Sequence, residues 1–192
     1  MNASLPERRL RGDPTNGTLG TLFFVAAEAM FFLGLVFVAH ELRHSSPTWP
    51  PPGAPAPDAW LLLGNTVVLL VSSLTMHLAV RALRRDDRRA LVRRLVATTL
   101  LGLVFLVGQG VEFNRLGGWQ PAGSLSRTLF DVLAGMHGLH VTAGLVLLGV
   151  VLARARLGQF SARRHLAVSA AEIYWHFVTA VWLVLFAVLV VH

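Results

Sequence analysis

The stretch TLFFVAAEAMFFLGLVFVAH, residues 21–40, decides the fold class of this chain. A helix needs about 20 mainly apolar residues to cross the hydrocarbon core of a bilayer, and this stretch has that length. It carries one acidic side chain, Glu28, near its middle. A charge at membrane depth costs at least about 2.5–3.5 kcal/mol, so an acid there is expected to face protein or water. The stretch therefore predicts a membrane-spanning helix with a buried polar site.

Four further stretches have the same character. The chain of 192 residues is 54% hydrophobic and only 14% charged, which is too apolar for a soluble domain. The apolar runs are continuous rather than alternating, so they predict helices and not barrel strands. We expect an all-α fold, a polytopic membrane bundle of five transmembrane helices within residues 18–192, preceded by a polar arm at 1–17. The expected spans are residues 18–41, 59–80, 95–114, 128–153 and 167–191.

The arginines predict the orientation of these helices. Fourteen of the 17 lie in three segments, namely the arm, the loop after the second span and the loop after the fourth. By the positive-inside rule these segments are cytoplasmic, so the N-terminus is inside, the C-terminus is outside, and the chain is a multi-pass protein of the inner (plasma) membrane. We expect Arg81, Arg84 and Arg85 to contact lipid headgroups, and we expect no nucleic-acid partner.

Glu28 is the first of several polar side chains at membrane depth. Its place about ten residues into the first span puts it near the bilayer midplane, since a helix rises about 1.5 Å per residue. Two interpretations stay open. The carboxyl is either a neutral group that bonds to a neighbouring helix, or a proton-linked site at a surface between subunits.

Histidines in two spans form the second group. His137 and His140 are three residues apart, so they share a helix face and are candidates for hydrogen-bonded packing or for a haem with His77 or His176 as the second ligand. Glu172 and His176 form a polar stripe with Thr179 on the last helix. A hydrogen bond from Glu28 to His140 or to His176 is compatible with their depths. We expect packing roles, with no metal and no haem bound by this chain.

Other polar residues are expected to join helices rather than to react. Asn65 lies on the second span, and Gln109 and Glu112 form a pair near the outer end of the third. The chain has no cysteine, and it shows no nucleophile–base pair, phosphate loop or dinucleotide fingerprint. We therefore predict no catalytic residue.

Several motifs follow one another in a recognisable order. They are Glu28-Ala29-Met30-Phe31-Phe32, Trp49-Pro50-Pro51, Leu63-Gly64-Asn65-Thr66, Gln109-Gly110-Val111-Glu112-Phe113, Gly135-Met136-His137-Gly138-Leu139-His140-Val141 and Tyr174-Trp175-His176-Phe177-Val178. In order and spacing the chain resembles subunit III of the haem–copper respiratory oxidases, in its shorter five-helix form. It departs from that family at Thr179, where an acidic residue is usual.

The resemblance implies an accessory subunit of a proton-pumping terminal oxidase, a component of an oxidoreductase complex without its own catalytic centre. Such a subunit packs beside the catalytic subunit I and the other oxidase subunits, binds phospholipid, supports proton uptake and protects the enzyme during turnover. Haem and copper are then expected in the catalytic subunit. The resemblance carries the buried carboxylate to Glu28 and the midplane histidines to His137, His140 and His176.

Two alternatives stay open at this point. One is a related partner of a quinol oxidase or a nitric-oxide reductase. The other is a haem-binding membrane electron carrier that uses the histidines, which an absorption spectrum of the isolated chain would distinguish.

The arginine distribution yields a prediction about topology. Reporter fusions placed after Arg85 and at His192 should lie on opposite sides of the membrane, the first in the cytoplasm, because three spans separate the two positions. Reporter activity on the same side at both positions would contradict the five-span arrangement.

Overall fold

The computed structural model describes residues 14–45, 58–117, 125–161 and 165–190. They form five long helices, α1 (Pro14–Ser45), α2 (Ala59–Arg84), α3 (Arg88–Gly117), α4 (Leu125–Arg156) and α5 (Leu166–Val190). All five are long and apolar enough to cross a membrane, which confirms the all-α, five-helix fold. The helices extend beyond the expected spans, because polar turns continue the helical hydrogen bonding past the apolar core.

The first 13 residues, most of the expected polar arm, and the motif Trp49-Pro50-Pro51 lie outside the described residues. Within the described part, α1 already begins at Pro14, so the last residues of the expected arm are helical.

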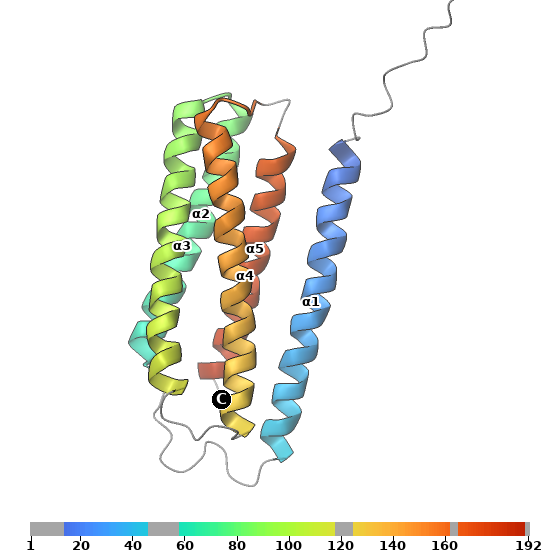
Figure 1. The fold of residues 1–192 in the computed structure, drawn as a ribbon, viewed down its shortest axis with the longest axis vertical. Coiled ribbons are helices and arrows are strands. Elements are labelled where there is room, and N and C mark those ends of the chain that lie inside the picture. Colours follow the sequence, from blue (N-terminus) through green and yellow to red (C-terminus); the bar gives the residue numbers. More distant parts are fainter. Residues whose placement is uncertain (1–13, 46–57, 118–124, 162–164, 191–192) are drawn as a thin grey trace, which may run out of the picture.

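Four of the helices form a packed bundle, and α1 lies at its side (Figure 1). Helix α5 packs against α1, α2 and α4, while α2 and α3 make the most extensive helix pair. Among the described residues, α1 has no contact with α2 or α3. Among residues 16–45 of α1, only Phe32 and Ala39 are buried, and large apolar side chains such as Phe23, Met30 and Phe37 are exposed. An outer face of this kind suits lipid or another membrane subunit.

The chain reverses direction at each connection (Figure 1). The start of α1, the turn between α2 and α3, and the connection between α4 and α5 lie at one end of the molecule. Arg88 reinforces this end, because it donates from the start of α3 to the carbonyls of Ala155 and Arg156 at the end of α4. The described arginines of both connections therefore gather at a single face, as the positive-inside pattern requires.

Trp175 lies at the centre of the bundle and is completely buried. Its indole ring fills the space that two glycines leave open, Gly102 on α3 and Gly144 on α4. A Cβ atom added at either glycine would lie 2.8 or 2.9 Å from the ring. The small residues thus let α4 pack closely on α5 and let the Trp175 ring reach α3, as expected for helices in a membrane.

Hydrogen bonds hold that ring in place. The Trp175 Nε1–H donates to Ser72 Oγ at 3.1 Å, and the Ser72 hydroxyl donates to the Thr98 carbonyl at 3.0 Å. One chain of bonds therefore joins α5, α2 and α3. A second bond, from Trp182 Nε1 to Thr66 Oγ1 at 3.0 Å, joins α5 to α2 about two helical turns further along α5.

The close approach at Trp175 yields a prediction about stability. Gly102→Ala and Gly144→Ala should each destabilise the purified protein by about 1–3 kcal/mol, since the new methyl group overlaps an indole that is fixed by its own hydrogen bond. Gly110→Ala on α3 and Gly149→Ala on α4 are matched controls with open space at the Cβ position, and they should be neutral or slightly stabilising. Thermal unfolding in detergent measures the difference, and equal midpoints for all four variants would contradict this packing.

Candidate functional site

Glu28 and His140 form a direct hydrogen bond between two helices within the membrane-spanning part of the fold. Oε2 of Glu28 on α1 lies 3.0 Å from Nε2 of His140 on α4. The other ring nitrogen, Nδ1, lies 2.7 Å from the Met136 carbonyl, which can only accept, so Nδ1 carries a proton. The Glu28–Nε2 contact therefore holds one further proton, which lies either on the carboxyl or on the imidazole. Of the two expected bonds, the one to His140 is the one that forms.

Aromatic rings enclose this pair. Phe32 presents its edge to His140 with ring centroids 4.9 Å apart, and the Tyr174 hydroxyl donates to the His140 carbonyl at 3.1 Å. The side chains of Glu28 and His140 are 26% and 12% exposed, so the pair is largely shielded but still reachable from the α1 side. This contact joins α1 to α4, two helices that otherwise touch little.

His137 has a different environment from His140 although both lie on α4. It is 1% exposed, and its ring stacks on Trp182 at a centroid distance of 5.4 Å. Phe105 presents an edge to it at 6.1 Å. Neither ring nitrogen of His137 has a hydrogen-bond partner among the described residues. The expected packing role therefore fits His137, but as an aromatic ring rather than as a hydrogen-bonding group.

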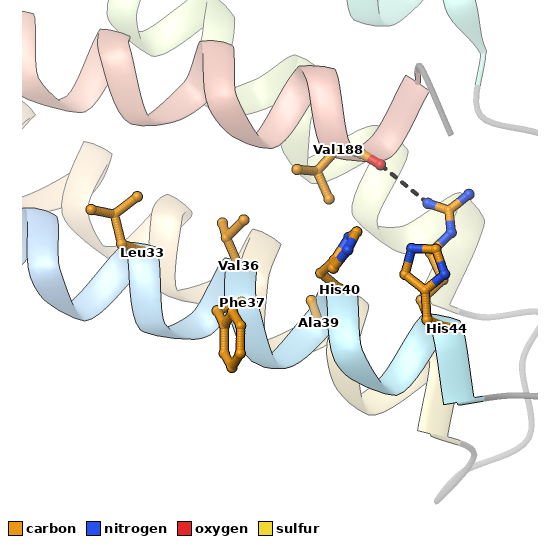
Figure 2. A pocket seen from close by; sticks show the side chains of 8 residues that line it. Leu33, Val36, Phe37, Ala39, His40, His44 and Val188 are labelled. Carbon is orange, nitrogen blue, oxygen red and sulfur yellow. Dashed lines mark hydrogen bonds between the residues drawn. The ribbon is translucent and has the colours of Figure 1, made fainter.

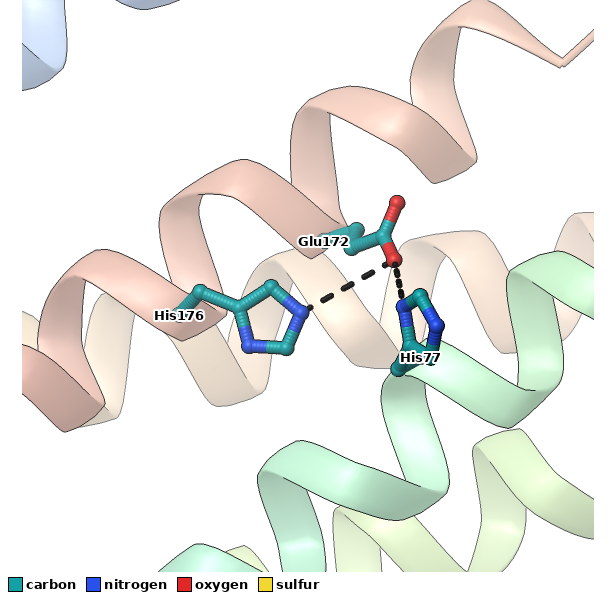
Figure 3. A group of neighbouring side chains, drawn as sticks. All are labelled: His77, Glu172 and His176. Atoms are coloured by element: carbon teal, nitrogen blue, oxygen red, sulfur yellow. Dashed lines mark hydrogen bonds and ion pairs between the residues drawn. The ribbon is translucent and has the colours of Figure 1, made fainter.

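Glu172 and His176 meet a residue of another helix (Figure 3). Glu172 Oε1 lies 3.0 Å from Nδ1 of His77 on α2 and 3.7 Å from Nε2 of His176. The second nitrogen of His176, Nδ1, lies 2.6 Å from Ser73 Oγ. Thr179 does not join this group, since its hydroxyl donates to the Trp175 carbonyl at 2.9 Å on its own helix.

Two of the three residues expected to join helices, Asn65 and Glu112, bond across the contact between α2 and α3. Asn65 is buried and donates to the Phe105 carbonyl at 3.2 Å, close to the backbone of Gly108. Glu112 is 3% exposed, pairs with Arg115 at 2.9 Å and accepts the Asp58 N–H at 3.1 Å at the start of α2. Gln109 does not bond to Glu112, and its Nε2 has no partner among the described residues.

Basic side chains lie near both ends of the helices. Arg81, Arg84 and Arg85 are exposed at the end that carries the arginine segments, as headgroup contact requires. At the opposite end, α1 and α5 enclose a cavity of about 680 Å³ (Figure 2). Its lining is apolar for most of its length and ends in basic side chains; the residues are Leu33, Val36, Phe37, Ala39, His40, Arg43, His44 and Val188.

Two of these contacts differ from what the sequence predicts. His77 is expected there only as a candidate haem ligand, and Ser73 has no predicted bond to His176. A signal for both exists, because Ser73 and His77 are four residues apart and so share one face of α2. Which helix that face meets depends on the packing around Trp175, and the pattern of a single sequence does not contain it.

Comparison with known proteins places these features in a family. The family model of cytochrome c oxidase subunit III matches residues 15–192. The chain is 40% identical over 176 residues to the cytochrome c oxidase subunit 3 of Synechocystis sp., covering 91% of this chain and 75% of that protein. It is 37% identical over 177 residues to the protein of the same name from Thermostichus vulcanus, covering 92% and 87% of the two chains. It is 35% identical over 179 residues to the probable cytochrome c oxidase subunit 3 of Mycobacterium tuberculosis H37Rv, covering 92% and 88%.

The matched range takes in all of the described bundle from residue 15 onward. The resemblance found in the sequence motifs is thereby confirmed. The chain belongs to the cytochrome c oxidase subunit III family.

Proposed function

We propose that this chain is the accessory subunit III of a proton-pumping terminal oxidase and stabilises its catalytic haem–copper subunit. The observation that carries the proposal is the family match over residues 15–192. The exposed apolar residues of α1 form a surface on which another membrane subunit can pack, because no polar group has to be desolvated there. Since the relatives are named as cytochrome c oxidase subunits, this role is favoured over partnership with a quinol oxidase or a nitric-oxide reductase.

The environment of the midplane histidines supports a role without haem in this chain. His140 is engaged at both ring nitrogens, by the Met136 carbonyl and by Glu28. His137 lies between aromatic rings that fill the space an axial ligand needs on its open side. A haem on either histidine would have to displace these contacts. The electron carrier is therefore the weaker candidate, and the redox chemistry belongs to the partner subunit.

We place phospholipid in the cavity between α1 and α5 (Figure 2). Side chains such as Leu33 and Phe37 offer an apolar wall to an acyl chain, while Arg43 and His44 lie where a phosphate group would reach. At the opposite end the exposed Arg81, Arg84 and Arg85 suit the headgroups of the cytoplasmic leaflet. Lipid bound at these places would fill the space beside α1 and support its position on the bundle.

The Glu28–His140 bond gives the proposal a proton-linked element. It lies in the membrane part of α1, it can share a proton, and the Glu28 side chain is 26% exposed. A subunit that supports proton uptake needs polar groups of this kind near its partner surface. The chain then lies in the inner (plasma) membrane with its N-terminus in the cytoplasm.

The same bond yields a prediction for Glu28 variants. Glu28→Gln should keep assembly, since the amide N–H donates to His140 Nε2. Glu28→Ala should weaken retention of the chain in the purified complex by about 1–3 kcal/mol, because the buried nitrogen loses its partner. Glu41→Ala, at an exposed position on the same helix, is the control and should behave as the wild type.

A hydrophobic carbodiimide should also label Glu28, because such reagents dissolve in lipid and need a protonated carboxyl. Peptide mapping identifies the modified residue. Label on Glu112 or Glu172 with Glu28 unmodified would contradict a proton shared at this site.

The accessory role yields a prediction for deletion of the chain. The complex without it should keep its haem spectra and its initial rate of oxygen consumption, while activity over many turnovers and the proton-to-electron ratio should fall. The reason is that removal exposes an apolar face of the catalytic subunit and displaces ordered lipid near it. Oxygen consumption and proton uptake by the two complexes give the comparison. Loss of activity from the first turnover, with an intact catalytic spectrum, would contradict a non-catalytic role.

A further inference from the structure

His77, Glu172 and His176 place three metal-ligating groups at one point of the bundle (Figure 3). One ligand atom from each residue lies within 4.8 Å of the other two. The measured separations are 3.0 Å from Glu172 Oε1 to His77 Nδ1 and 3.7 Å to His176 Nε2. Ligand atoms around a tetrahedral Zn²⁺ are about 3.3 Å apart when the metal–ligand bonds are about 2.0–2.1 Å. Small side-chain rotations therefore bring these atoms to that spacing.

We propose that these three residues bind Zn²⁺, with two imidazoles and one carboxylate as ligands and a water molecule in the fourth position. Imidazole and carboxylate donors suit Zn²⁺, and three protein ligands with one open position are a known arrangement for this metal. The proposal goes beyond the accessory role, and it departs from the expectation that the chain binds no metal.

Ser73 supplies the support that a histidine ligand needs. Its hydroxyl lies 2.6 Å from His176 Nδ1, the nitrogen that does not face Glu172. When Nδ1–H donates to Ser73, the lone pair of Nε2 points toward the carboxylate, an arrangement that a cation between them stabilises. Ligating histidines commonly donate their second N–H to a neighbouring group, which fixes the ring and its tautomer.

The depth of the cluster lets a hydrated ion reach it. Helix α2 has 26 residues and is about 39 Å long, so each end projects about 4–5 Å beyond a hydrocarbon core of about 30 Å. His77 lies about 10 Å from the end of α2, and Glu172 lies about 9 Å from the start of α5. His77 and Glu172 are thus within about 5–6 Å of the core boundary, at the end where the arginine segments gather, and His176 lies about one helical turn deeper.

Exposure and charge agree with an accessible cation site. The side chains of His77 and His176 are 46% and 40% exposed, while Glu172 is 15% exposed. A carboxylate shielded from water near hydrocarbon gains from a cation at contact distance. The bound ion would join α2 to α5 one turn inside the exposed Arg81, next to hydrogen bonds that already join these two helices.

The test is a zinc titration of the purified oxidase complex, with bound metal counted by mass spectrometry after equilibrium dialysis. The wild-type complex should bind one Zn²⁺ more than complexes with His176→Gln, Glu172→Gln or His77→Gln. Ser73→Ala should keep the number of ions and lower the affinity about 10-fold, as removal of a supporting partner does. His165→Gln removes an exposed histidine that lies outside the cluster, and it should leave binding unchanged. Zinc sites in other subunits cancel in these differences.

Equal binding by the wild type and all three ligand variants would overturn the proposal. If the ligand variants fail to assemble, X-ray absorption of the wild-type complex, measured against a complex lacking this chain, decides instead. Two imidazoles and one carboxylate at about 2.0–2.1 Å support the site, and any other ligand set overturns it. Mass spectrometry of the same preparation shows whether the chain is present in the complex. The accessory role is therefore tested independently of zinc binding.

Discussion

The bundle depends on hydrogen bonds within the protein for polar groups that water cannot reach. In the hydrocarbon core an indole N–H or a hydroxyl must find a partner within the protein. The Trp175 N–H donates a hydrogen bond to Ser72, and the Ser72 hydroxyl donates one to the Thr98 carbonyl. The ring can reach Ser72 only because Gly102 and Gly144 leave room for it. Three helices are therefore fixed around one side chain of α5, and the other contacts follow from that placement.

Helix α1 obeys a different balance. It buries little apolar surface against the bundle, so packing alone holds it weakly. Its specific attachments include the Glu28–His140 hydrogen bond, the Phe32 ring and the bond from Arg43 to the Val188 carbonyl. A hydrogen bond is directional, so it fixes the position of α1 along and around the bundle where apolar contacts are few. The outward face of α1 and the cavity beside α5 then remain for lipid and for other subunits of the oxidase.

The ionisable residues divide into three environments that serve different purposes. Glu28 and His140 are hydrogen-bonded beside α1, and His137 is an aromatic member of the core. Glu172 and His176 lie nearer the arginine-bearing end and meet His77 across a helix contact. This separation is consistent with a subunit that positions and protects a catalytic partner.

The sequence by itself determined the five spans, their alternation and the side on which the arginines gather. These features are local, since about 20 apolar residues suffice to define a span and flanking charges orient it. It also identified the ionisable residues, from Glu28 to His176, whose burial in the membrane costs free energy. Only the tertiary structure decided their partners. Glu28 meets His140 and not His176, and His137 turns into the core although it shares a helix with His140. These choices depend on how far each helix is rotated about its axis, and the interlocking of Trp175 with two glycines on other helices sets that rotation.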